Sequence, residues 1–190
     1  ADPIRREHTD RGPWLDQLLE WLLANVDDMM NSSSSASIAH GDYRLGNVII
    51  HPTEPKVVAV LDWELSTIGE PLADLAYCCM MYYGAGSLAM SESPPEGTPR
   101  EDGLVARYLK RRGMAPMDPK LWTFLKAFIL FRSAAITHGV FSRGLQGNAS
   151  STRALTYFDG FRASARTGCE LVAAVFGKQA MPAAEARARL

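Results

Sequence analysis

Residues 38–64 of the chain are IAHGDYRLGNVIIHPTEPKVVAVLDWE, and this stretch is the most informative part of the sequence for the fold. Two β-branched runs, NVIIHP and KVVAVLD, flank the turn-forming segment PTEP, a pattern typical of a short β-hairpin. A carboxylate stands at each end, with Asp42 before the first run and Asp62 closing the second. Because a hairpin folds the chain back on itself, we expect Asp42, Asn47 and Asp62 to converge.

Helical patterns surround this predicted hairpin. Helices are predicted from the spacing of apolar residues, from proline, serine or threonine at a helix start, and from glycine at a helix end. The predicted helices cover 13–30, 70–83, 101–113, 118 to about 138, and 150–176. A serine-rich connector is expected at 31–37 and a Gly/Ser/Pro-rich loop at 84–99. The sequence therefore predicts an α+β fold that is mostly helical, with one small hairpin near its start.

Composition narrows the class of protein. A hydrophobic content of 47% and a charged content of 22% are typical of a globular chain, and 190 residues can bury one sizeable core. The net charge of −1 gives no reason to expect nucleic acid or an anionic membrane as a partner. We expect no apolar run of transmembrane length and no signal peptide. Three cysteines without metal or disulfide spacing favour an intracellular, reducing compartment.

The segment HGDYRLGN carries the predicted chemistry. Four residues separate Asp42 from Asn47, which is the spacing of the protein-kinase catalytic loop H-R-D-x-x-x-x-N. In that chemistry Asp42 would accept the proton of a substrate hydroxyl, and Arg44 could reach the transferring phosphate. Asn47 and Asp62 would offer the hard oxygens that Mg²⁺ prefers. The alternative is that Asp42 and Asn47 are turn residues that cap a loop.

Two further residues are expected to support this loop. His40 should brace it through hydrogen bonds rather than take part in the chemistry. Asp74 is an acid in the otherwise apolar segment PLADLA, and a buried carboxylate requires hydrogen-bond donors. We therefore expect Asp74 to anchor the backbone of the catalytic loop.

Residues 38–83 resemble the aminoglycoside phosphotransferase/choline-kinase branch of the protein-kinase-like fold. In that branch HGD-x4-N and D-[WF]-[EG] replace the protein-kinase motifs, and here they stand as HGDYRLGN and LDWE. The longer segment through LSTIGEPLADLAY, together with GVFSRGLQGNASS at 139–151, resembles the kinase-like domain fused to some acyl-CoA dehydrogenases. The resemblance spans about 13–177 and implies the C-terminal lobe of that fold, with the hairpin carrying the catalytic loop.

The resemblance also implies roles. Asp42 would be the catalytic base, Asn47 and Asp62 the Mg²⁺ ligands, and ATP the phosphoryl donor, while Arg44 stands where protein kinases carry a lysine. Glu64 departs from the D-F-G glycine and would act on the metal directly or through water. The implied acceptor is the hydroxyl of a small molecule, such as a hydroxyacyl-CoA, another metabolite or an aminoglycoside-like compound.

The expected domain organisation is a phosphotransferase C-lobe at 13–177, an N-terminal extension or expression remnant at 1–12, and a frayed tail at 178–190. A glycine-rich loop and a strand lysine, which an N-lobe would supply, are not found before His40, so we expect weak or no activity from this chain alone. Fusion to or association with an acyl-CoA dehydrogenase domain is the expected partnership. A catalytically silent kinase-like binding module and a Mg²⁺-dependent phosphohydrolase remain as alternatives.

Overall fold

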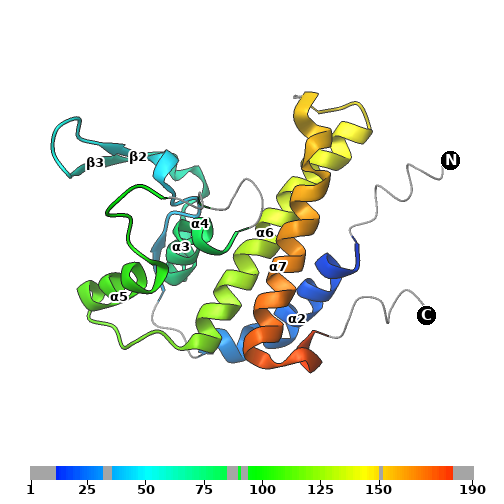
Figure 1. The fold of residues 1–190 in the computed structure, drawn as a ribbon, viewed down its shortest axis with the longest axis horizontal. Helices are drawn as coiled ribbons and strands as arrows, with labels where there is room; N and C mark the ends of the chain where they lie inside the picture. Colours follow the sequence, from blue (N-terminus) through cyan, green and yellow to red (C-terminus); the bar gives the residue numbers. More distant parts are fainter. Residues whose placement is uncertain (1–11, 32–35, 85–89, 91–93, 150–151, 182–190) are drawn as a thin grey trace.

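A computed structural model of the protein describes residues 12–31, 36–84, 90, 94–149 and 152–181 (Figure 1). Several segments that the sequence predicts lie partly or wholly outside these residues. Most of the extension at 1–12, four residues of the serine-rich connector, parts of the 84–99 loop and the tail beyond 181 lie outside the described residues.

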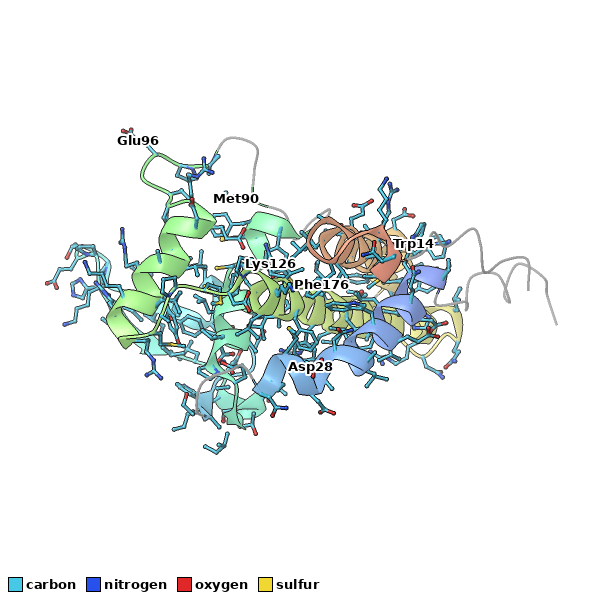
Figure 2. The ribbon with its side chains drawn as sticks, turned by 90° about the horizontal axis from the view of Figure 1, so that it is seen from below. Trp14, Asp28, Met90, Glu96, Lys126 and Phe176 are labelled. Carbon is cyan, nitrogen blue, oxygen red and sulfur yellow. The ribbon has the colours of Figure 1, made fainter. Side chains whose placement is uncertain are left out.

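Three long helices form the main body: α2 (Gly12–Asn31), α6 (Pro119–Leu145) and α7 (Phe158–Phe176). α6 and α7 run side by side in Figure 1, α2 crosses them at an angle, and the three helices pack on one another. Trp21 of α2 is buried against Phe124 of α6 and Phe176 of α7, with ring centres 5.9 Å and 5.0 Å away. Figure 2 shows Trp14 at the junction of α2 and α7, where its carbonyl oxygen lies 3.4 Å from the Cys169 sulfur.

Two antiparallel ladders, rather than one hairpin, lie at the other side of the molecule. The predicted hairpin is present as β2 (Val48–Ile50) paired with β3 (Val57–Val60). A second ladder joins β1 (Ser37–Ala39) to β4 (Thr67–Gly69) and was not predicted. Its strands are three residues long and far apart in sequence, so neither has a local hydrophobic pattern that would reveal it. The catalytic loop therefore lies between the two ladders instead of on one hairpin.

The predicted helix at 70–83 is divided in two. Glu70 caps α3 (Pro71–Cys78) by accepting a 2.8 Å hydrogen bond from the Leu72 amide, and α4 (Met80–Tyr83) follows after a break at Cys79. Both helices are buried on one face rather than all round. This matters for function, because the half-buried face of α3 is the one that meets the catalytic loop.

Of the remaining helices, α5 and α6 start as predicted and the last one starts later. α5 (Glu101–Arg112) ends on Gly113 in the left-handed conformation, which confirms the predicted C-cap. α6 continues to Leu145, well past the expected end near His138, because no proline interrupts it. The last helix was predicted from 150, but a 3-10 turn at Thr152–Tyr157 precedes α7. This turn packs closely on α6, since a Cβ on Gly144 would lie 2.8 Å from the Ala154 Cβ.

α6 is long and apolar enough to cross a membrane by length and composition, with a mean hydropathy of 1.3 over an 18-residue window. The expectation that no apolar run reaches that length was therefore wrong. In the described part of the chain α6 packs on α2, α3 and α7, as the central helix of a globular core does.

All three cysteines of the chain are free thiols, and burial raises the pKa of Cys79 and of Cys169 to about 12. An ordinary thiol has a pKa near 8.5, so we expect these two to react with a disulfide reagent at pH 8 about 100-fold more slowly in the native chain than in guanidinium chloride. Reagent absorbance with mass spectrometry of each cysteine measures this. Rapid modification of either residue in the native protein would contradict the burial described here.

Candidate active site

Helix α3 binds the loop that follows β1 through hydrogen bonds. The Asp74 carboxylate accepts hydrogen bonds from two successive backbone amides, those of His40 and Gly41, the second at 2.9 Å. β1 brings the loop to this point, and Pro71 together with the Glu70 cap fixes where α3 begins. This is the contact that the sequence predicted for Asp74.

His40 links the loop to the segment that follows β3. The residue is 3% exposed, and the centre of its ring lies 4.7 Å from the centre of the Trp63 ring. Nδ1 accepts from the Asp42 amide at 3.2 Å, and Nε2 lies 2.7 Å from the Leu61 carbonyl oxygen. This pair of partners assigns the ring proton to Nε2. His40 therefore links the Asp42 amide to the Leu61 carbonyl, next to the two predicted acidic residues.

Asn47 holds the Asp42 side chain. It lies in a 3-10 turn at Leu45–Asn47 and is buried, and its Nδ2 donates to Asp42 Oδ2 at 2.7 Å and to the Asp42 carbonyl oxygen at 2.9 Å. The four residues between them form the turn that allows this. The spacing in HGDYRLGN thus brings the two residues into direct contact.

The Asp42 carboxylate is kept ionised by its neighbours. Partial burial raises its pKa, but hydrogen bonds from Tyr77 and Asn47 and the charge of Arg44 outweigh burial, so the pKa lies below the ordinary value. Arg44 itself is half-exposed and its Nε is 3.5 Å from Asp42 Oδ2, a long contact. Arg44 is thus free to turn toward a bound phosphate.

Asp62 has a special backbone. It adopts φ 60° and ψ 55°, and among the described residues it is the only one other than glycine with a positive φ. Left-handed conformations of this kind cost energy and concentrate at functional sites. The residue before it is fixed on both sides, because the Leu61 amide donates to the Asn47 carbonyl oxygen at 2.8 Å and the Leu61 carbonyl meets His40. Asp62 is therefore tied to the turn that carries Asn47.

The donor set suits Mg²⁺. Within the described residues, the Asn47 side chain donates its hydrogen bonds from Nδ2. Its Oδ1 atom can therefore bind a cation. The Asp62 and Glu64 side chains are exposed. No group of three or more His, Cys, Asp or Glu side chains in the described ranges could hold a metal by itself. Mg²⁺ commonly binds one or two protein oxygens together with substrate phosphates, so this sparse set fits it.

Two residues at the site were missed by sequence reasoning. Tyr77 of α3 helps to lower the pKa of Asp42, and Arg132 of α6 donates from Nη1 to the Gly41 carbonyl oxygen at 2.6 Å. Tyr77 follows Asp74 by one helical turn, and this spacing could have placed it on the same face. Arg132 is 91 positions away from Gly41, and no local pattern links them.

Gly41 should not tolerate a side chain. Its φ is 83°, and a Cβ would lie 2.5 Å from the Leu65 carbonyl oxygen. We expect Gly41→Ala to lower the free energy of unfolding by roughly 2–4 kcal/mol, since backbone strain and a steric clash add. Chemical denaturation measures this, with Gly103→Ala on α5 as the control because nothing lies within 4 Å of a Cβ there. Equal stability of the two variants would contradict the loop geometry.

A helical lobe with Asp and Asn side chains on a loop anchored to a helix is an arrangement that suits a phosphotransferase. A profile of the phosphotransferase enzyme family matches residues 2–119, and the chain belongs to this family. The resemblance noted from the motifs is thereby confirmed.

Similar proteins support this membership. The chain is 38% identical over 183 residues to rat acyl-CoA dehydrogenase family member 11, covering 94% of this chain and 23% of that protein. It is 38% identical to mouse acyl-CoA dehydrogenase family member 10, covering 79% and 14%. A crystal structure from Ralstonia eutropha, assigned as an aminoglycoside phosphotransferase, is 37% identical with a TM-score of 0.69, covering 84% of this chain and 48% of that one. The chain thus spans about a quarter or less of these curated relatives.

Proposed function

We propose that this chain supplies the catalytic lobe of an ATP- and Mg²⁺-dependent phosphotransferase that acts on the hydroxyl of a small molecule. The observation that carries the proposal is the Asp42 side chain, held by Asn47 on a loop that Asp74 fixes by two backbone amides. A silent binding module would have no use for a carboxylate held in this way.

Asp42 would orient the acceptor hydroxyl and accept its proton. Its lowered pKa keeps it ionised at neutral pH, so it acts chiefly by aligning the nucleophile and receives the proton late. Arg44, half-exposed beside it, would pair with the transferring phosphate. Phosphoryl transfer depends mainly on such positioning and charge stabilisation.

Asn47 and Asp62 would hold the Mg²⁺, with Glu64 acting directly or through a water. The bound ion would neutralise charge on the phosphoryl oxygens of ATP. The left-handed turn at Asp62 and the Leu61 bonds that precede it would set the direction of this carboxylate.

The acceptor is proposed to be an anionic metabolite, with a hydroxyacyl-CoA as the leading candidate. A pocket of about 500 Å³ opens beside the catalytic loop, lined by Tyr43 on one side and by Arg107, Arg111 and Arg112 of α5 on the other. A polycationic aminoglycoside would be repelled by these guanidinium groups, whereas phosphates would pair with them. Asp74 also lines the pocket, but its carboxylate is engaged by the loop amides.

Two properties of the wider protein follow as proposals. Because the similar proteins in rat and mouse are named acyl-CoA dehydrogenase family members, we expect the full polypeptide to join or associate with such a domain. Free, buried thiols support an intracellular, reducing compartment.

The test is transfer of labelled γ-phosphate from ATP with and without Mg²⁺, in the 190-residue chain and in its full reading frame. The expected result is Mg²⁺-dependent labelling of hydroxyacyl-CoA thioesters but not of aminoglycosides, with weaker turnover by the shorter chain. Preferential labelling of aminoglycosides would overturn the acceptor assignment. A folded full-length protein that transfers no phosphate would favour the silent binding module.

A further inference from the structure

A second cavity, of about 640 Å³, lies between α5 and the start of α6 and is called here the α5–α6 cavity. It does not share its α5 residues with the pocket beside the catalytic loop. Arg107 and Arg111 line that pocket, whereas Ala106 and Lys110 line the α5–α6 cavity. Because neighbouring residues of a helix point about 100° apart, α5 separates the two spaces.

The wall of the α5–α6 cavity is mainly apolar, and its size lies within the range of about 300–1,000 Å³ that small-molecule sites have. Pro116 in the connecting loop and Pro119 at the start of α6 have restricted φ angles, which limits collapse of this wall. Methionine side chains can adapt their shape to a ligand. The apolar residues of α5 and of this loop that line the cavity are Val105, Ala106, Leu109, Met114, Pro116 and Met117.

The polar atoms of the cavity converge on one carboxylate. Oε1 of Glu101 accepts a 2.9 Å hydrogen bond from the Trp122 indole and lies 3.3 Å from the Lys126 ammonium nitrogen. All three residues line the cavity, and Lys126 is labelled in Figure 2. Both contacts use the same oxygen, so within the described part of the chain Oε2 of Glu101 is left to accept another hydrogen bond.

The Lys126 ammonium also has donors to spare. Its side chain is only 14% exposed, and among the described residues Glu101 is its one oxygen partner. The aromatic rings of Tyr83 and Trp122 lie 5.2 Å and 6.0 Å from the nitrogen and stabilise its charge. An ammonium carries three N–H groups, and a largely buried donor without an acceptor is unfavourable. An acceptor oxygen on a ligand would satisfy one of them.

The charges of the cavity decide what kind of ligand suits it. Glu101 and Asp102 are balanced by Lys110 and Lys126. An anion would meet the two carboxylates, a cation would meet the two ammonium groups, and either would lose its hydration in an apolar space. A neutral ligand avoids these costs. An amide matches the remaining groups, because its carbonyl accepts and its N–H donates.

We propose that the α5–α6 cavity binds a neutral, largely apolar small molecule that ends in a carboxamide. The carbonyl oxygen of the ligand accepts from the Lys126 ammonium, its N–H donates to Oε2 of Glu101, and its apolar part lies between α5 and the connecting loop. The site lies outside the catalytic loop, and binding there does not depend on the proposed function.

Three probes of similar shape test the polar end of the ligand: naphthamide, which is neutral, naphthoate, which is an anion, and naphthylmethylamine, which is a cation. The readout is the NMR signal of the Trp122 indole N–H in the 190-residue chain, assigned through Trp122→Phe. We expect naphthamide to shift this signal in a saturable way and to bind at least about tenfold more tightly than either charged probe. The indole signal of Trp14, which does not line the cavity, should stay in place.

Two substitutions test the location. Lys126→Met should weaken naphthamide binding about tenfold, and Lys110→Met, the same change at the exposed edge of the cavity, should alter it by less than about twofold. Ala106→Phe adds a ring to an exposed position of the wall and should abolish binding while the fold is kept, as circular dichroism would verify. This variant decides the question even if Lys126→Met does not fold.

Three results would overturn the proposal. The first is a Trp122 signal that naphthamide does not shift up to its solubility limit. The second is equal affinity for the three probes, which would refute the carboxamide assignment. The third is naphthamide binding by folded Ala106→Phe as tight as by wild type, which would place the probe elsewhere.

Discussion

Replacing Asp42 by asparagine is expected to lower kcat by about 10²–10⁴-fold, the usual contribution of a general base. Asparagine has nearly the same shape and can remain beside Asn47, but it cannot accept a proton. KM for ATP should change by less than about threefold, because Asp42 is not among the proposed metal ligands. Steady-state kinetics of the full-length protein with Mg²⁺-ATP measures both constants.

The control for this variant is Asp28→Asn, which changes an exposed carboxylate on α2 (Figure 2). It makes the same chemical change and should leave kcat unaltered. Unchanged turnover in Asp42→Asn would refute the mechanism proposed here, even if the protein transferred phosphate by a different mechanism.

The same substitution has an expected pH signature in stability. The pKa of Asp42 is lowered in the fold, so its ionised form contributes stability that is present above the unfolded-state pKa and is lost as the pH falls through the folded-state value. The difference in Tm between wild type and Asp42→Asn should therefore shrink as the pH falls below about 4. Thermal unfolding followed by circular dichroism between pH 7 and pH 3 would measure this.

Local patterns were enough to predict the hairpin and the loop before it. The spacing of Asp42 and Asn47 is typical of a turn, and here that turn brings the two side chains together. The contact of Asp74 with the loop followed from a different argument, namely that a carboxylate in an apolar helix requires donors. Both arguments use only the residue and its immediate neighbours.

What could not be predicted depends on distance along the chain. β1 and β4 are three residues each and are defined by pairing with each other, so their pattern appears only after folding. Arg132 meets Gly41 across 91 positions because α6 packs on α3, and the packing of two helices has no signal in either sequence segment. The left-handed turn at Asp62 was not predicted, because glycine is the usual residue at a positive φ and an aspartate gives no such signal.

Replacing Asp74 by asparagine is expected to lower the free energy of unfolding by about 2–4 kcal/mol and also to reduce kcat. The carboxylate accepts from two backbone amides, and an asparagine offers one oxygen and one NH₂, so one amide donor would face another donor. Losing a hydrogen bond to a charged acceptor and leaving a partly buried donor unpaired account for this range. Urea denaturation gives the stability, and the same kinetic assay gives the activity.

Asp118→Asn is the matched control, because Asp118 also accepts from a backbone amide, that of Lys120 at 2.9 Å, at the exposed start of α6. Asparagine caps helices about as well as aspartate, so the free energy of unfolding of the Asp118→Asn protein should stay within about 0.5 kcal/mol of wild type. Asp74 binds the backbone amides of His40 and Gly41, and the next peptide, between Gly41 and Asp42, is the one that Arg132 and the His40 ring contact, so loss of Asp74 should loosen Asp42 as well as the fold. An Asp74→Asn protein as stable and as active as the Asp118→Asn control would show that α3 does not anchor the loop.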